Sequence, residues 1–317
     1  MPKNLKLLLL ILWLSLPFWW MTNIFEKGFR DFFYVREFNK RPLYLAQISS
    51  GSLSTKIPQR IAYIPDEINA ASAISVLIDA QGREFPLFKK NSQEKLAIAS
   101  LTKLVTGLTA LDIYDPSLKI NITAEAVAQP EPIGQLKVGE NLQVKDLLKI
   151  MLIESSNDAA FALSQVIGEK SFVDLMNLES QFLGLKSSHF VNPTGLDPED
   201  LAASHNYSSA EDLVKLAKHL IFEKPEIVGI LGHAEYDLYL ENGILHHTLK
   251  NTNKLLGERP DIIAGKTGHT EKAGECLILI LRGPWRKSYF VNVVLGSQDK
   301  FQAMKKLIDW VNSSYKF

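Results

Sequence analysis

The stretch AIASLTKL, residues 97–104, places a serine and a lysine three positions apart. If the stretch is helical, Ser100 and Lys103 lie on one helix face, and the hydroxyl and the amine can meet. A serine hydroxyl becomes a good nucleophile when a base takes its proton. A lysine can be that base only when it is neutral, which requires a pKa lowered by burial or by a second cation nearby. The pair therefore predicts a base-activated serine, provided that the fold supplies one of these conditions.

The spacing alone is weak evidence, because Ser-x-x-Lys occurs four times in the chain. Ser100 differs from the other serines in being surrounded by apolar residues, so its lysine partner needs a reason. The other matches lie in a polar run, in an expected strand-to-helix turn and at the C-terminus, and they are read as solvated residues: Ser92/Lys95, Ser297/Lys300 and Ser313/Lys316.

Two more short polar segments contain residues that could join this pair. Ser155-Ser156-Asn157 lies in a break between two apolar helical segments, where serine and asparagine are also favoured as helix caps. Lys266-Thr267-Gly268 occurs once, after an apolar stretch and before two expected strands. Taken alone, the first segment reads as a helix cap. The second reads as a turn with a solvated lysine, although its flanks also favour a strand.

Hydrophobic patterning predicts the elements that must position these motifs. Residues 74–88 read as a β-hairpin with its turn at residues 80–82, and a helix is expected from about Ser100 to Asp112. Ser208 with Glu211 three residues on has the pattern of a capping box at a helix start. Further helices are expected at 144–153, 159–167, 171–185, 208–221 and 299–317, and strands at 277–283 and 288–297 after a loop region.

Strands are thus expected near both ends of the folded region, and helices fill its middle. The economical arrangement is an α+β architecture, in which one antiparallel sheet is built from N- and C-terminal segments with an inserted helical region.

The N-terminal residues predict a membrane anchor. Residues 7–25 run without a charge, about the length of roughly 20 residues that crosses a bilayer as a helix. The alternative is a cleaved signal peptide, but the bulky sequence WWMTNIF offers no small-x-small cleavage site. With either reading, the residues after about 30 are expected outside the cytoplasm. The flanking cations and interfacial aromatics that favour a cytoplasmic N-terminus are Lys3, Lys6, Trp19 and Trp20.

The sequence therefore predicts four segments. They are a cytoplasmic stub at 1–6, a transmembrane helix at 7–25, a juxtamembrane segment and linker at 26–70, and a folded domain at 71–317. The linker reading depends on SSGSLSTK and on the nearby prolines.

Composition excludes several classes of function. The 35 basic and 35 acidic residues balance, so there is no basic field for nucleic acid. A single cysteine excludes an internal disulfide framework and a cysteine-rich metal site. Cys276 itself, in ECLILIL, reads as a small buried residue of a strand.

The motifs occur in the order shared by class A β-lactamases and penicillin-binding proteins: Ser-x-x-Lys, a serine triplet ending in Asn, and Lys-Thr-Gly. A lysine at 266, if near Lys103, would help to keep Lys103 neutral by charge repulsion. Beyond the motifs, about residues 70–300 resemble the serine-type D-Ala-D-Ala carboxypeptidases, which are low-molecular-mass penicillin-binding proteins of the β-lactamase-like superfamily. The segments that carry the resemblance are IASLTKLVTGLTAL, SSND, NPTGLD, HNYSSAEDL and AGKTGHTEKAGECL.

The resemblance implies a β-lactamase/transpeptidase-like fold and roles for the residues that match the motifs. Ser100 would attack the carbonyl between two D-alanines of a peptidoglycan stem peptide, and Lys103 would accept its proton. Ser155 would relay a proton towards the leaving amine. Asn157 would bind the substrate amide and orient Lys103.

The same resemblance implies a substrate-binding group around Lys266, Thr267, Gly268 and His269. Lys266 and Thr267 would receive the terminal carboxylate, while the backbone N–H groups of Ser100 and His269 would hold the oxyanion. The strand after Lys266 would pair with the extended peptide. The imidazole of His269 is not expected to form a Ser-His-Asp triad.

Further implications concern partners. The resemblance implies no metal and no cofactor, peptidoglycan stem peptides as substrates, and β-lactam antibiotics as covalent inhibitors. The apolar run at 7–25 predicts that the protein is held in the cell membrane by one N-terminal helix, with its catalytic domain outside the cytoplasm, and a monomer is expected. Ser156 departs from the glycine or alanine usual in the family. The second, β-rich domain and the C-terminal anchor often found there are not expected after the last helix.

Three alternatives remain open. A D,D-endopeptidase would cut peptidoglycan crosslinks with the same residues. A β-lactamase would need fast deacylation, for which class A enzymes use a loop glutamate. Glu199, in NPTGLDPED, does not match that pattern. A non-catalytic wall-binding module would keep the cleft without hydrolysis.

Overall fold

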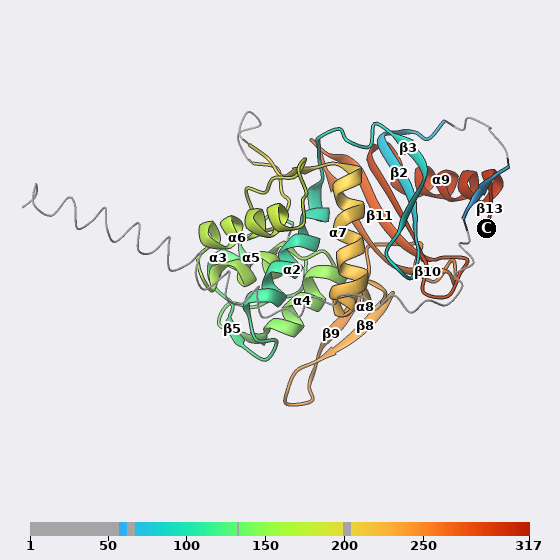
Figure 1. Cartoon of the computed structure of the whole chain (residues 1–317). Coiled ribbons are helices and arrows are strands. Elements are labelled where there is room, and N and C mark those ends of the chain that lie inside the picture. The colour runs from blue at the N-terminus through green and yellow to red at the C-terminus, as the bar shows by residue number, and fades with distance from the viewer. Residues whose placement is uncertain (1–56, 62–66, 132, 199–203) are drawn as a thin grey trace, which may run out of the picture. The chain divides into compact units, whose positions relative to one another are not determined.

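The computed structural model describes residues 57–61, 67–131, 133–198 and 204–317 (Figure 1). These residues belong to one compact unit, Lys56–Phe317. The expected transmembrane segment at 7–25 and most of the expected linker lie outside the described residues. Within the described part of the chain, no helix combines the length and the apolar character needed to cross a membrane.

A five-stranded antiparallel sheet joins the two ends of this unit. Its strand order is β10-β11-β12-β2-β3, so the N-terminal hairpin pairs with the C-terminal strands through β2 and β12. In that pairing, Ile74 lies opposite Val293. The predicted α+β architecture with a sheet from both ends is therefore confirmed. The strands are β2 (Ala70–Ile78), β3 (Glu84–Lys90), β10 (Ile262–Thr270), β11 (Gly274–Arg282) and β12 (Tyr289–Ser297).

Besides the main sheet, the described residues form four two-stranded pairs. The first strand, β1, lies within the range assigned to the linker and pairs with the C-terminal β13. Strands β8 and β9 form a hairpin in the region that the sequence indicated as a loop, because their exposed, polar face hides the alternating pattern. The pairs are β1 (Gln59–Arg60) with β13 (Tyr315–Lys316), β4 (Leu96–Ala97) with β7 (Tyr207–Ser208), β5 (Lys119–Asn121) with β6 (Asn141–Gln143), and β8 (Glu235–Tyr239) with β9 (Leu245–Lys250).

The helices follow the predicted segments closely. Helix α4 spans the residues that hydrophobic spacing indicated, and the expected helix after Ser100 begins as a 3₁₀ turn, η1, before it becomes α2. The helices are η1 (Ala99–Thr102), α2 (Lys103–Ile113), α3 (Ala124–Val127), α4 (Val144–Ile153), α5 (Asn157–Gln165), α6 (Glu169–Phe182), α7 (Ala210–Glu223), α8 (Pro225–Leu231) and α9 (Lys300–Ser314).

The predicted capping box at the start of α7 is wrong by one residue. Ser209 is the N-cap, and its Oγ accepts a hydrogen bond from the N–H of Asp212 at 3.2 Å. Ser208 instead belongs to β7, where its backbone pairs with β4. Glu211 accepts a hydrogen bond from Lys89 at 2.7 Å. Two adjacent serines before two adjacent acids leave the register open in sequence, and the strand pairing decides it.

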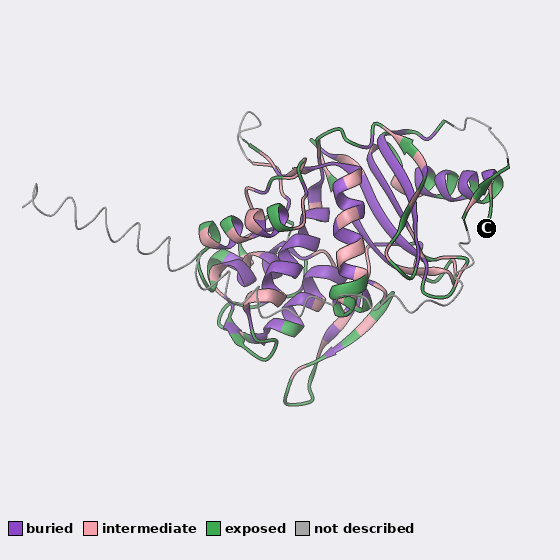
Figure 2. Cartoon of the chain, in the orientation of Figure 1, coloured by how far each residue is buried: buried purple, intermediate pink, exposed green. Residues whose placement is uncertain are grey.

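Both faces of the sheet are covered. Helix α7 packs with the helical region on one face, and α9 packs on the other (Figures 1 and 2). Cys276 is fully buried in β11, as expected for a small strand residue, and burial raises its pKa to about 11. Alternation along β11 supplies both cores, with Cys276, Ile278 and Ile280 towards the helical region and Leu277, Leu279 and Leu281 towards α9.

Helix α5 carries a buried carboxyl in its first turn. Asp158 is 2% exposed, and its Oδ1 has no hydrogen-bond partner among the described residues. Burial raises the pKa of this carboxyl from the usual 3.8 to about 6. The folded state therefore holds the proton more tightly than the unfolded chain does. The raised pKa leaves the free energy of unfolding unchanged below about pH 4, lowers it progressively between about pH 4 and 6, and has its full effect above pH 6.

We expect D158N to stabilise the full-length protein at pH 8 but much less at pH 4, because the amide removes the cost of the raised pKa only where the unfolded carboxyl would ionise. The difference in Tm between D158N and wild type should reach about 2 °C or more at pH 8. Calorimetry at the two pH values measures it, with D174N on the exposed face of α6 as the control. A difference independent of pH would contradict the assignment.

Candidate active site

Ser100 and Lys103 meet where η1 becomes α2. Lys103 Nζ lies 2.9 Å from Ser100 Oγ, the contact that the spacing predicted. The preceding residue, Ala99, has a left-handed φ of 47°, which residues other than glycine rarely adopt. Such strain persists only where the surroundings fix it, and it is common at functional sites.

The Lys103 amine is completely buried and has three partners. Besides Ser100, it contacts Asn157 Oδ1 at 2.7 Å and the Thr194 carbonyl oxygen at 2.6 Å. The last two atoms can only accept hydrogen bonds. A neutral amine therefore donates its two N–H groups to them and directs its lone pair towards the Ser100 hydroxyl. This is the orientation that a general base needs.

Burial lowers the pKa of Lys103 to about 7, against the Coulombic effect of Glu131, which raises it. A base with a pKa near the working pH is well matched to proton transfer. Burial, and not charge repulsion from Lys266, is thus the main cause of the lowered pKa. The expectation that Lys266 keeps Lys103 neutral is corrected in this respect.

Lys266 lies on β10, the strand that its flanks favoured, and its side chain is 1% exposed. Its Nζ donates to Ser155 Oγ at 2.8 Å and to the Thr267 carbonyl oxygen at 3.0 Å. The pKa of Lys266 is lowered well below its usual range by burial, and then by Lys103 and Lys300. Ser155 itself has a left-handed φ of 68°. Ser100 directly follows Ala99, which is strained in the same way.

The triplet 155–157 both caps a helix and supplies the site. Ser156 is the N-cap of α5 and accepts from the N–H of Ala159 at 3.1 Å, as the cap reading predicted. Asn157 uses Oδ1 on Lys103, while its Nδ2 donates to the Pro130 carbonyl oxygen at 2.9 Å. The structure therefore shows the contact that orients Lys103. It gives the amide nitrogen a protein partner that the sequence did not reveal.

Two glycines let the backbone close around Ser100. A Cβ on Gly268 of β10 would lie 3.1 Å from Ser100 N and 3.0 Å from the Ile98 carbonyl oxygen. Gly195 has a left-handed φ of 84°, and a Cβ there would lie 2.1 Å from the Ala99 carbonyl oxygen. The first glycine thus allows β10 to lie against η1, and the second fixes the turn on the other side.

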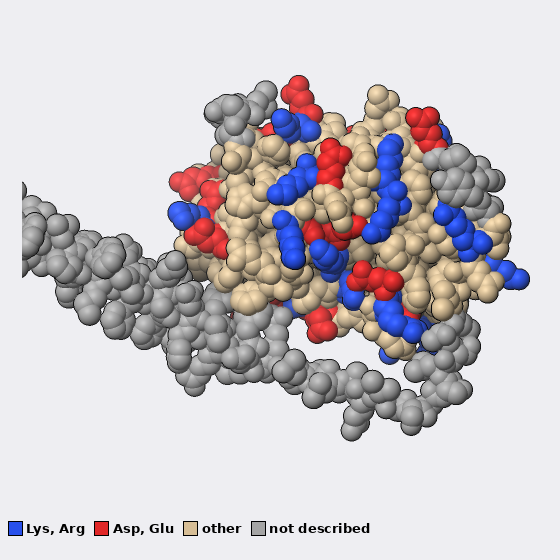
Figure 3. Space-filling view, turned by 45° about the horizontal axis from the view of Figure 1, so that its top comes forward, with Lys and Arg blue, Asp and Glu red and all other residues tan. Residues whose placement is uncertain are grey.

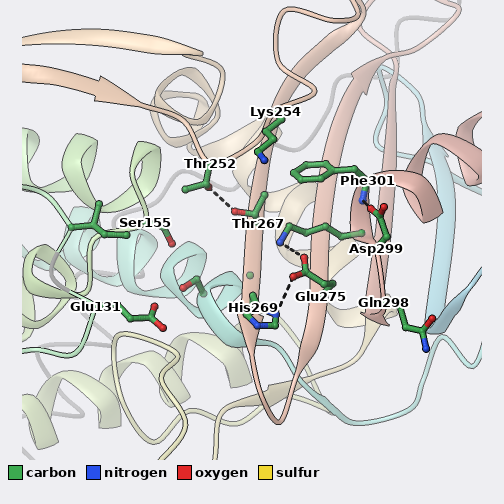
Figure 4. A pocket seen from close by; sticks show the side chains of 14 residues that line it. Glu131, Ser155, Thr252, Lys254, Thr267, His269, Glu275, Gln298, Asp299 and Phe301 are labelled. Carbon is green, nitrogen blue, oxygen red and sulfur yellow. Dashed lines mark hydrogen bonds and ion pairs between the residues drawn. The ribbon is translucent and has the colours of Figure 1, made fainter.

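Residues on β10 beyond Lys266 face the same cleft. Thr267 Oγ1 lies 2.6 Å from Thr252 Oγ1. The exposed imidazole of His269 forms an ion pair with Glu275, at 3.0 Å between Nδ1 and Oε1, and Glu275 also pairs with Lys300 (Figure 4). The hydrogen bond that the described structure gives to Ser100 Oγ is with Lys103 and not with His269, so His269 is not the base of this serine.

These residues line a cleft of about 500 Å³ (Figure 4). The sequence identified five of the lining residues: Ser100, Ser155, Thr267, Gly268 and His269. The cleft walls also contain residues that it did not assign to the site, because they reach the site from loops, from β11 and from the start of α9: Glu131, Ile133, Thr252, Lys254, Glu275, Gln298, Asp299, Lys300 and Phe301.

The charges on the described surface are mixed. On the face drawn in Figure 3, basic and acidic side chains are interspersed and form no large patch of one sign. In the described ranges, no group of three or more His, Cys, Asp or Glu side chains is placed to hold a metal ion.

Known proteins are similar to this chain in sequence and in fold. The profile of the D-alanyl-D-alanine carboxypeptidase family, Peptidase_S11, matches residues 59–299. D-alanyl-D-alanine carboxypeptidase DacF of Bacillus subtilis is 34% identical over 240 residues, covering 73% of this chain and 59% of that protein. The chain thus spans less than two thirds of this relative. The D-alanyl-D-alanine endopeptidase of Pseudomonas aeruginosa is 30% identical over 292 residues, covering 86% of each chain.

A solved structure gives the same fold. Penicillin-binding protein D2 from Listeria monocytogenes, in its cefotaxime-bound form, has a TM-score of 0.68 and 25% identity, covering 79% of this chain and all of that one. The expected transpeptidase-like α+β fold is therefore confirmed. With the family profile covering most of its length, the chain belongs to the D-alanyl-D-alanine carboxypeptidase family.

Proposed function

We propose that this protein is a serine-type D-Ala-D-Ala carboxypeptidase that removes the terminal D-Ala of peptidoglycan stem peptides through an acyl-enzyme at Ser100. The observation that carries the proposal is the buried Lys103 amine, whose partners leave its lone pair for the Ser100 hydroxyl. Family membership supports the choice of substrate.

In the acylation step, Ser100 Oγ attacks the carbonyl between the two D-alanines as Lys103 takes its proton. The backbone N–H groups of Ser100 and His269 hold the oxyanion that develops. The Ser155 hydroxyl, in contact with Lys266, passes a proton to the amine of the departing D-Ala, and the proton that Lys103 took from Ser100 replaces it, so that Lys103 is neutral again. Water then attacks the ester and loses a proton to Lys103. That proton returns to Ser100 Oγ as the ester bond breaks, which releases the shortened peptide and restores the serine.

Substrate binding uses the free edge of the sheet. β10 ends the strand order and lies beside η1, so an extended peptide can pair with it by strand addition. The terminal carboxylate would lie against Lys266 and Thr267, and a nearby anion favours the charged form of a lysine. A contact between Asn157 Nδ2 and the substrate amide would replace the one to Pro130.

The remaining proposals concern location and partners. The uncharged run at 7–25 supports a single membrane anchor that keeps the domain at 71–317 outside the cytoplasm as a monomer. β-Lactams are proposed as covalent inhibitors, supported by the cefotaxime-bound form of the Listeria relative.

A D,D-endopeptidase is the second candidate function. The Pseudomonas relative with that activity in its name matches over 86% of both chains, so its length is similar to that of this protein. The two activities use the same acylation chemistry and differ in whether the departing amine belongs to a free D-Ala or to a crosslinked strand.

The nucleophile is tested by incubating the full-length protein with benzylpenicillin and recording its intact mass. We expect one covalent adduct on wild type and on S313A, the serine of another Ser-x-x-Lys pair, and none on S100A. No adduct with rapid loss of the drug would indicate a β-lactamase. No adduct and no loss of drug would favour a wall-binding module.

The base is tested by the pH dependence of the acylation rate. Because Lys103 must be neutral to accept a proton, the rate should rise with pH to a plateau, with its midpoint at about pH 7. E131Q removes the carboxylate that raises the pKa of Lys103, so its midpoint should move to lower pH. The exposed E226Q on α8 should leave the midpoint unchanged, and an unmoved midpoint in E131Q would exclude Glu131 from this role.

The two peptidase activities are separated by substrate. We expect the protein to release D-Ala from a monomeric pentapeptide at least about tenfold faster, in kcat/KM, than it splits a crosslinked muropeptide dimer, a difference of about 1.4 kcal/mol. Chromatography of both digests measures the ratio, with S100A as the blank. Faster cleavage of the dimer would make the endopeptidase the main activity.

A further inference from the structure

Outside the cleft, two histidines and two glutamates form a connected chain. The Nδ1 atoms of the adjacent His246 and His247 lie 2.5 Å apart. His246 Nε2 lies 3.0 Å from Glu140 Oε1, and His247 Nε2 lies 2.9 Å from Glu154 Oε2. All four side chains are largely buried, with exposed fractions from 6% to 17%. The groups follow one another in the order Glu140, His246, His247, Glu154.

A β-bulge brings the two imidazoles together. Successive residues of a regular strand point to opposite faces, so neighbours such as these would normally diverge. In the pairing of β8 with β9, Leu238 lies opposite His247 but Tyr239 lies opposite Leu245, which leaves His246 as the extra residue. Bulges of this kind change the direction of a side chain and occur often near functional sites.

The contacts determine how many protons the pair can hold. The carboxylates of Glu140 and Glu154 accept hydrogen bonds, so each facing Nε2 donates one. Two bare lone pairs, or two N–H groups, would repel each other across the contact between the Nδ1 atoms, so a hydrogen bond there needs a single proton between them.

This chain of groups ends next to the site. Glu154 is the C-cap of α4 and directly precedes Ser155, whose left-handed φ of 68° requires support from its surroundings. The same part of the chain holds the end of α4 a second time, through a hydrogen bond from Thr252 N–H to the Ile153 carbonyl oxygen at 3.3 Å. The β8–β9 hairpin and the residues after it thus fix the backbone from which Ser155 projects.

We propose that the His246–His247 pair, sharing one proton between Glu140 and Glu154, is a positioning device that holds Ser155 against Lys266. The inference rests on the proposed function, because Ser155 is there the group that passes a proton to the leaving amine. His247 acts through Glu154 and touches neither substrate nor the reacting atoms.

Other charged groups on the packed elements have partners of their own. Lys145 on α4 also acts electrostatically on Glu241. The proposal therefore concerns the protonation of the two histidines and the two glutamates, on which the contact between the imidazoles depends. The neighbouring contacts are Lys119–Glu241 at 2.6 Å, Gln143 to Glu241, Lys149–Asp146 at 3.3 Å, and Thr248 to Asp237 at 2.6 Å.

The support for Ser155 should therefore depend on pH. Histidines change charge between about pH 5 and 8. A second shared proton would place two N–H groups face to face, and the pair would separate and displace the hairpin that holds Glu154. Acid conditions should then weaken the positioning of Ser155 in addition to protonating Lys103.

The test compares acylation of full-length wild type, H247Q and H247L by benzylpenicillin from pH 5.5 to 8. Glutamine keeps an N–H donor for Glu154 but cannot take a second proton, whereas leucine keeps bulk alone. The ratio of the H247Q rate to the wild-type rate cancels the titration of Lys103. H233Q, an exposed histidine before the same hairpin, is the matched control.

We expect H247L to acylate at least about fivefold more slowly at pH 8, with kcat for the peptide reduced and KM unchanged. H247Q should match wild type at pH 8 and exceed it at least about threefold at pH 5.5. A ratio of H247Q to wild type that is constant with pH, or an H247L rate equal to that of wild type, would overturn the proposal. Failure of wild type itself to acylate would refute the proposed function instead.

Discussion

The burial of one amine sets the conditions for the rest of the site. Lys103 begins α2 with its Nζ fully enclosed, and this enclosure brings its pKa to about 7. A buried ammonium without partners would be costly, and a buried neutral amine still needs acceptors for its N–H groups. Asn157 Oδ1 and the Thr194 carbonyl oxygen supply them. Since these come from segments far apart in sequence, the base exists only in the assembled fold.

The sheet and the helical region meet at the cleft, where β10 packs against η1. Strand β10 approaches η1 closely enough to form one wall of the cleft, and a Cβ at 268 would crowd the backbone of Ile98 and Ser100 at 3.0–3.1 Å. Ala99, which begins η1, and Ser155, whose Oγ contacts Lys266 of β10, both have left-handed φ angles. Residues in such conformations are maintained by surrounding packing, and both faces of the sheet are covered by helices that supply it. The packing of the helices on the sheet thus maintains the backbone conformation of the site.

The sequence predicted the contacts and elements that form within one short segment. The contact of Ser100 with Lys103 follows from helical spacing, and the strand at Lys266 follows from its apolar flanks. What stayed hidden depends on contacts between distant segments. No periodicity shows that Pro130 takes the Asn157 amide, or that Glu131 lies in the cleft. The cap of α7 was missed by one residue because strand pairing, not propensity, decides it. The histidine pair was missed because a bulge reverses the alternation that a strand pattern assumes.

The two buried lysines form a system in which binding and proton transfer are linked. Lys103 and Lys300 both lower the pKa of Lys266, which in the empty cleft is driven towards its neutral form by burial. A substrate carboxylate beside Lys266 would favour its charged form, and the anion would offset that charge as felt by Lys103. The base can then remain neutral while the second lysine becomes a cation. In the proposed reaction, a terminal carboxylate thus lets Lys266 become a cation without preventing Lys103 from taking the proton of Ser100.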